Sequence, residues 1–296
     1  MKKSNFLSFL LILVSTIVFG SLEEISIAEK NVLIDLYHTT NGEEWNNTWN
    51  LDAPISTWKG VTIKENHIVE LNLFHNNLNG YLPESIGDLV NLRVLNLAFN
   101  NITGVLPKNV VRLQSLRILK LEMNRIKGAI PLGIGKLQKL EEFSMFNNFL
   151  SGPIPETFGD ISTLKILNLS SNNLKGTIPN SLGKLENLQT LGLFENALQG
   201  EIPREMGNLK DLKELVLANN QLEGEIPVEL DQLASLKVLQ IQNNRIKSFK
   251  GLEKMKSRSL LVFDTDEKKY DLKFDPSAIR NSRMADTKFE DVDDNE

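Results

Sequence analysis

The sequence predicts a repeat solenoid, in which short coils stack on one another, and three observations lead to that prediction. Asparagine recurs every 24 residues, an alternating pair of apolar residues precedes each asparagine, and glycine followed by proline comes after most of them. The asparagines are Asn76, Asn100, Asn124, Asn148, Asn172, Asn196, Asn220 and Asn244. A fixed period of roughly 20 to 50 residues is typical of proteins whose units pack only against their neighbours.

Each repeat unit is interpreted as one coil. The apolar pair, for example Leu167 and Leu169, predicts a short strand, because alternate residues of a strand point to the same side. Gly176 permits a tight bend and Pro179 cannot sit in a central strand, so together they turn the chain away from the strand. Leucines that follow, such as Leu185, then close the core of the coil.

The recurring asparagine is interpreted as structural. Its side-chain amide offers two donors and an acceptor, which can satisfy backbone groups left unpaired where the coil bends inside the core. We therefore expect the eight asparagines, called the asparagine ladder below, to hold the coils together rather than to contact a ligand.

The repeat resembles the plant-type leucine-rich repeat, LxxLxLxxNxLxGxIPxxLGxLxx, as in LKILNLSSNNLKGTIPNSLGKLEN from Leu164 to Asn187. The resemblance covers about two thirds of the chain. It implies an α/β solenoid, a right-handed leucine-rich repeat superhelix with a parallel β-sheet on its concave face. It also implies recognition of a ligand by that face, as in receptor ectodomains and polygalacturonase inhibitors of this subtype.

Solenoids need capped ends, because a terminal coil would expose its apolar side. Residues 24–70 are expected to form a helical N-terminal cap, with Trp45, Trp49 and Trp58 covering the first coil. This segment resembles the plant cap, W…DPCxWxGVxC, but Ile55 and Ile63 stand where that cap has cysteines. The departure favours a bacterial source, in which apolar packing replaces a disulfide. Exposed tryptophans that stack on a sugar are the alternative interpretation.

The remaining boundaries follow from composition. Residues 71–254 are expected to hold eight coils, the last of them degenerate, and residues 255–275 a short β C-terminal cap with strands near 260–263 and 270–274. Residues 276–296 are acidic and are expected to be disordered.

The first 20 residues have the pattern of a secretory signal peptide, with Lys2 and Lys3 before an apolar run and small residues preceding a cleavage site after Gly20. An uncleaved anchor is the alternative. The mature chain is expected to have no transmembrane segment and to be secreted, periplasmic or held at the cell surface. The chain has no cysteine, which excludes disulfides and thiol chemistry.

No motif in the sequence indicates catalysis or a cofactor. His38, His67 and His75 fit no metal-ligand spacing, and neither a phosphate loop nor a GxSxG elbow occurs. The formal net charge of −5, without a basic stripe, argues against a nucleic-acid partner. We therefore expect no catalytic residue, no cofactor and no metal, and we expect the chain to function by binding.

Binding is expected on the exposed face of the predicted sheet, where two columns of side chains run along the coils. The Phe74 column contains Phe74, Ala98, Glu122, Phe146, Ser170, Phe194, Ala218 and Gln242. The His75 column contains His75, Phe99, Met123, Asn147, Ser171, Glu195, Asn219 and Asn243. The candidate ligand-binding residues are Phe74, His75, Phe99, Lys120, Glu122, Met123, Phe146, Phe194 and Glu195.

The large apolar members of these columns form a predicted strip of exposed aromatic anchors. The nearby charged residues are expected to orient a partner, and they are Lys120, Glu122, Glu142 and Glu195. Packing of the phenylalanines on one another is the alternative. The expected ligand is a protein or peptide. Glycan binding, inhibition of a secreted polysaccharide-degrading enzyme, and a purely structural role in the cell envelope remain as alternatives.

Overall fold

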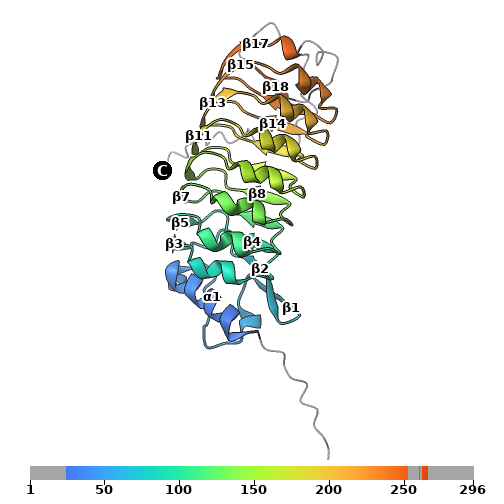
Figure 1. Ribbon diagram of the computed structural model, residues 1–296. Coiled ribbons are helices and arrows are strands. Elements are labelled where there is room, and N and C mark those ends of the chain that lie inside the picture. Colours follow the sequence, from blue (N-terminus) through green and yellow to red (C-terminus); the bar gives the residue numbers. More distant parts are fainter. Residues whose placement is uncertain (1–24, 253–259, 261, 266–296) are drawn as a thin grey trace, which may run out of the picture.

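The computed structural model describes residues 25–252, 260 and 262–265. Within them the chain winds into stacked coils along one axis, so that neighbouring coils are neighbours in sequence (Figure 1). One ten-stranded sheet, called the main sheet below, runs the length of the stack. Its strands in spatial order are β1 (Val61–Lys64), β2 (His67–Asn72), β4 (Val94–Asn96), β6 (Ile118–Lys120), β8 (Glu142–Ser144), β10 (Ile166–Asn168), β12 (Thr190–Gly192), β14 (Glu214–Val216), β16 (Val238–Gln240) and β18 (Val262–Asp264).

The 24-residue period sets the register of the main sheet. From β2 onward every strand pairs in parallel with the next, and each residue lies opposite the one 24 positions along, as Leu167 lies opposite Leu191. Equivalent residues therefore stack in columns. The antiparallel strand β1 pairs with β2 and covers that edge of the sheet.

The return arm of each coil contains a short 3-10 helix, which in the first seven coils begins directly after the recurring proline. These helices are η3 (Glu84–Asp88), η4 (Lys108–Arg112), η5 (Leu132–Lys136), η6 (Glu156–Asp160), η7 (Asn180–Lys184), η8 (Arg204–Asn208) and η9 (Val228–Gln232), with η10 (Lys250–Leu252) in the last coil. Gly159 allows two of them to stack closely, because a β-carbon there would lie 2.3 Å from the Ser181 carbonyl oxygen. Helices need more room than strands spaced about 4.8 Å apart, so the main sheet lies on the concave side.

A second set of strands follows the asparagines. It forms a six-stranded sheet of β7 (Lys127–Gly128), β9 (Phe149–Gly152), β11 (Asn173–Gly176), β13 (Ala197–Glu201), β15 (Gln221–Glu225) and β17 (Arg245–Ser248), and a pair of β3 (Asn79–Tyr81) and β5 (Asn101–Thr103). The sequence predicted only a turn at this place. The backbone of neighbouring coils is therefore paired along two sides of the solenoid, and the predicted solenoid with a parallel concave sheet is confirmed.

The asparagine ladder connects neighbouring coils inside the stack. The Asn124 side-chain amide donates to the carbonyls of Leu97 in the preceding coil and Leu121 in its own, both at 3.0 Å. Its oxygen accepts from the Ile102 backbone N–H at 2.9 Å. Asn76 has no earlier coil to contact, and its oxygen accepts instead from the Asn47 backbone N–H at 2.7 Å.

The N-terminal cap comprises α1 (Ile27–Thr39), η1 (Gly42–Glu44), η2 (Ile55–Thr57) and strand β1. Trp45, Trp49 and Trp58 are at most 4% exposed, and the Trp49 and Trp58 rings stack with centroids 4.8 Å apart. Each indole N–H donates to a backbone carbonyl at 2.9 Å. The tryptophans are thus core residues of the cap, and their burial excludes the sugar-stacking alternative.

At the other end, the main sheet continues past the eighth asparagine. Strand β18 pairs with β16 in the 24-residue register, Val262 lying opposite Val238. Strand β18 overlaps the strand expected near residues 260–263, and it extends the main sheet into the segment expected to form the C-terminal cap. The expected strand at 270–274, the acidic tail and the signal peptide lie outside the described residues.

Candidate functional site

The Phe74 column mixes bulky and small side chains, and their exposure differs accordingly. Phe74 is 53% exposed, whereas Ala98, Ser170 and Ala218 are buried, as expected if their larger neighbours cover them. Phe146 and Phe194 are only partly exposed. Of the predicted aromatic anchors in this column, Phe74 is therefore the most exposed, and Phe146 and Phe194 are partly covered by their neighbours.

The His75 column has an unusual backbone. All eight residues adopt positive φ angles, between 49° and 57°, as the chain turns out of the strand towards the ladder asparagine. The backbone N–H groups of the first seven residues, from His75 to Asn219, each donate to a carbonyl of the next coil, as the Phe99 N–H does to the Glu122 carbonyl at 2.9 Å. Phe99 and Met123 hold this left-handed conformation although it disfavours side chains other than Asn and Asp.

Phe74 and Phe99 form the most exposed apolar feature of the concave face. Their ring centroids lie 5.2 Å apart, Phe99 is 40% exposed, and His75 lies next to the pair with its ring 6.1 Å from Phe74. A cavity of about 420 Å³ borders Phe74, and its lining includes the polar side chains of Asn47 and Lys59. An apolar pair beside polar groups at the N-terminal end of the concave face is the arrangement expected of a binding site.

The charged candidates gather around β6 and β8. Lys120 Nζ lies 3.0 Å from Glu142 Oε1. Glu122 is not the exposed charge that the sequence suggested, because only 7% of it is exposed. Burial raises the pKa of the Glu122 carboxyl, against opposing effects of its own backbone N–H, Lys120 and the Ser144 hydroxyl. Glu195 lies apart from this cluster, exposed, and accepts from the Ser171 hydroxyl at 2.8 Å.

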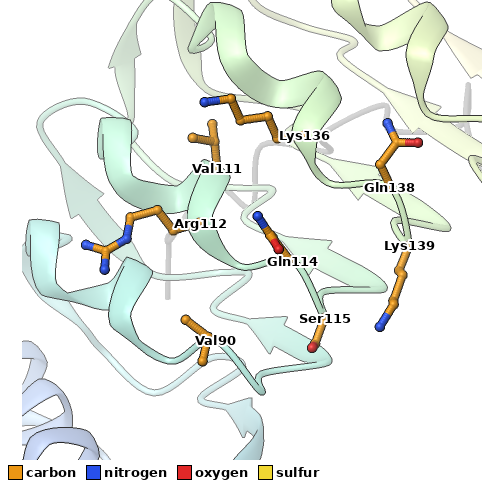
Figure 2. Close-up of a pocket in the computed structure, with 8 residues that line it drawn as sticks. All are labelled: Val90, Val111, Arg112, Gln114, Ser115, Lys136, Gln138 and Lys139. Atoms are coloured by element: carbon orange, nitrogen blue, oxygen red, sulfur yellow. The ribbon is translucent and has the colours of Figure 1, made fainter.

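The convex side carries a larger hollow that sequence reasoning did not single out. A groove of about 740 Å³ lies between the η4 and η5 coils, lined by Val90, Val111, Arg112, Gln114, Ser115, Lys136, Gln138 and Lys139. In Figure 2 the charged ends of its three basic residues lie well apart from one another. A similar groove of about 650 Å³ recurs three coils further on. Such grooves are a regular consequence of stacking coils, and this one offers no converging groups.

The described residues contain no group of three or more His, Asp or Glu side chains that could hold a metal ion. Over the same part of the chain, no helix has the length and apolar character needed to cross a bilayer. The one α-helix within the described residues, α1, has 13 residues.

Comparison with solved structures places this fold among receptor ectodomains and bacterial proteins. The ectodomain of the plant receptor kinase GASSHO1/SCHENGEN3 from Arabidopsis thaliana, solved with CASPARIAN STRIP INTEGRITY FACTOR 2, is 32% identical over 79% of this chain, with a TM-score of 0.74. The Arabidopsis receptor kinase HAESA, solved with the peptide hormone IDA and the co-receptor SERK1, is 40% identical over 60% of this chain, with a TM-score of 0.58. The chain spans only 30% and 29% of those two chains.

A leucine-rich repeat protein of Leptospira interrogans is 36% identical over 67% of this chain and 48% of its own, with a TM-score of 0.56. No curated protein sequence matches the chain significantly. Family models described as "Leucine rich repeat" match residues 66–126 and 138–198, and one described as "Leucine Rich repeats (2 copies)" matches residues 208–254. These matches cover more than half of the sequence, and the chain belongs to the leucine-rich repeat family.

Proposed function

We propose that the chain is an exported, non-catalytic module that binds a protein or peptide on its concave face. The observation that carries this proposal is the exposed Phe74–Phe99 pair on a face whose backbone is fixed by strand pairing. Aromatic side chains on a rigid surface lose little conformational freedom on binding, and they are enriched among the residues that dominate binding energies.

The concave face is large enough for such a ligand. Ten strands about 4.8 Å apart give a sheet on the order of 40 Å long, and a stable protein interface needs only about 800 Å² from each partner. The solved relatives add support, since HAESA is crystallised with a peptide hormone. Because the relative with the higher TM-score is a receptor ectodomain, it also supports an extracellular location for this chain.

The test uses two matched double variants. Peptides selected from a random phage-displayed library against the wild-type protein are measured by biolayer interferometry against Phe74→Ala/Phe99→Ala and against Tyr81→Ala/Phe149→Ala. The control residues lie on β3 and β9 of the second side, with 56% and 55% exposure, so they match the site residues in size and exposure. We expect at least a tenfold loss of affinity for the site variant and less than twofold for the control.

Equal losses in both variants, or a larger loss in the control, would show that the concave pair is not the contact. Phe146 and Phe194 are less useful for this test because they are partly buried, and their removal would also disturb packing.

The export part of the proposal is tested separately. Intact mass of the protein recovered from its native host should show that residues 1–20 are missing, whereas a full-length, membrane-associated chain would favour the anchor alternative.

A further inference from the structure

Glu122 is a buried carboxylate on a binding face, and the fold does not explain it. Its column neighbours in the adjacent coils are Ala98 and Phe146, so the repeat accepts small or apolar residues at this position. Only 7% of Glu122 is exposed, and its Oε2 atom has no hydrogen-bond partner. A buried carboxylate oxygen without a donor destabilises a fold, because it loses hydration without replacement.

The nearby charges leave this carboxylate undercompensated. Among the described residues, the Lys120 ammonium group is the one positive charge acting on both Glu122 and Glu142. Its Nζ atom pairs with Glu142 Oε1, at a distance of 3.0 Å. Glu142 lowers the stability of the ionised Glu122 further by like-charge repulsion. Around Glu122 the structure therefore holds one more negative than positive charge, and it lacks one donor.

The backbone that carries Glu122 is held in place. Its carbonyl accepts from the Phe99 N–H at 2.9 Å and from the Asn124 side-chain amide at 3.3 Å. Phe99 of the preceding coil and Asn124 of the same coil thus hold the backbone of Glu122 in place.

Apolar side chains flank the position on the same face. Met123 follows Glu122 in the chain, and Phe99 and Phe146 belong to the coils on either side. Asn147 donates to the Met123 sulfur at 2.7 Å, which fixes that side chain. A flat cation that can stack on aromatic rings while donating to a carboxylate fits such a setting.

We propose that Glu122, assisted by Glu142, binds an arginine side chain of the ligand on the concave face. The inference rests on the proposed function, since it names the chemistry of one ligand side chain at that site. Glu122 Oε2 is covered in the free protein, so a ligand reaches it only when neighbouring side chains move aside. A guanidinium has five N–H donors in a planar fork, enough to donate to Oε2 and to a second acceptor together. In the free protein Lys120, whose side chain is 34% exposed, forms an ion pair with Glu142. When the guanidinium binds, the Lys120 side chain moves away from Glu142. Lys120 thus competes with the ligand's guanidinium for the Glu142 carboxylate.

The experiment compares a charged probe with its neutral isostere. Acetyl-Phe-Arg-Phe-amide and the citrulline analogue are titrated into the 15N-labelled full chain at pH 7 and low salt, and concave-face amide shifts give each affinity. A third probe replaces arginine with lysine, to separate a planar guanidinium from any cation. We expect the wild type to bind the arginine peptide at least tenfold more tightly than the citrulline peptide, with the lysine peptide between them.

Two variants and one control make the assignment specific. Glu122→Gln should abolish the preference for arginine over citrulline, and Lys120→Met should strengthen binding of the arginine peptide several-fold because the competitor is gone. Glu223→Gln on β15, an exposed carboxylate of the second side, should behave as wild type. Melting temperatures of all variants confirm that they are folded.

The outcomes separate this inference from the proposed function. Equal affinities for the arginine and citrulline peptides in the wild type, or an unchanged preference in Glu122→Gln, overturn the arginine site alone, provided that binding still depends on Phe74 and Phe99. If no probe perturbs the concave face, both the site and the proposed function fail.

Discussion

The side-chain amide of Asn172 donates at 3.0 Å to the carbonyl of Met145, a residue of the preceding coil. The same amide reaches Leu169 in its own coil at 3.1 Å, and the asparagine oxygen accepts from the Leu150 N–H at 2.9 Å. The amide also donates to the Ser170 carbonyl at 3.1 Å, so that one side chain satisfies four backbone groups from two coils.

We expect Asn172→Ala to lower the free energy of unfolding by about 1–3 kcal/mol, because its buried backbone partners lose their hydrogen bonds. Urea denaturation followed by circular dichroism measures the loss. Asn173→Ala, at the exposed neighbouring position, is the control and should change stability by less than about 0.5 kcal/mol. An Asn172→Ala protein as stable as the control would show that the ladder does not hold the coils together.

Trp49→Ala should lower the free energy of unfolding by about 3–5 kcal/mol, since it removes a 3% exposed ring from the centre of the cap. It also removes the hydrogen bond to the Lys59 carbonyl. Thermal unfolding measures this effect. If the loss were small and Trp49→Ala instead abolished binding to a glycan array, the ring would have a ligand role after all.

Glu141 is expected to stabilise the folded protein at pH values above 4.5, the ordinary pKa of its carboxyl. This stabilisation is expected to disappear as the pH is lowered further. Hydrogen bonds from Lys165 and Arg117, both at 2.6 Å, lower the pKa of this carboxyl, so the folded protein binds its proton less readily than the unfolded chain does. The stability difference between wild type and Glu141→Gln should therefore shrink as the pH falls through the pKa of the folded state. A constant difference from pH 7 to pH 3 contradicts the assignment.

Glu122 should show the opposite dependence. Burial raises the pKa of this carboxyl above its ordinary value of 4.5, so the folded protein binds its proton more readily than the unfolded chain does. Stability relative to Glu122→Gln is therefore expected to fall as the pH rises through this range and to stay lower at pH 7. Denaturation midpoints of the two proteins at pH 4 and pH 7 test this directly. If the wild type instead became more stable relative to Glu122→Gln as the pH rises, the negative charge of Glu122 would be compensated within the folded protein.

The periodic features of the fold were predictable because each coil repeats the same chemistry. The strand around Leu167 and the turn at Gly176 follow from residue types that recur at the same position. The strand near residues 260–263 was predicted as part of a cap, but its place in the 24-residue register was not, because Lys268 stands where the next asparagine would be and the count of asparagines ended at Asn244. Strand β18 nevertheless pairs with β16 in the 24-residue register, although no asparagine of the ladder follows it.

The candidate site was predictable in place but not in detail. Strand alternation correctly put Phe74 on the exposed face, yet the left-handed turn at Phe99 and Met123 carries no signal in those residue types. Asn147, Asn219 and Asn243 of the same column were the available hint, since asparagine tolerates positive φ. The burial of Glu122 depends on its neighbours in other coils, which a single repeat does not reveal.

The constant register of the main sheet has a consequence for how such a protein changes in evolution. Because Leu167 pairs with Leu191 just as Leu191 pairs with Leu215, any coil presents the same edges to its successor. A duplication or deletion of one whole unit in the gene therefore leaves every remaining junction intact, while an insertion of half a unit would break two of them. Recombination between repeats can lengthen or shorten the concave face by whole coils, and it can move a residue such as Glu122 to a new distance from the aromatic pair without redesigning the core.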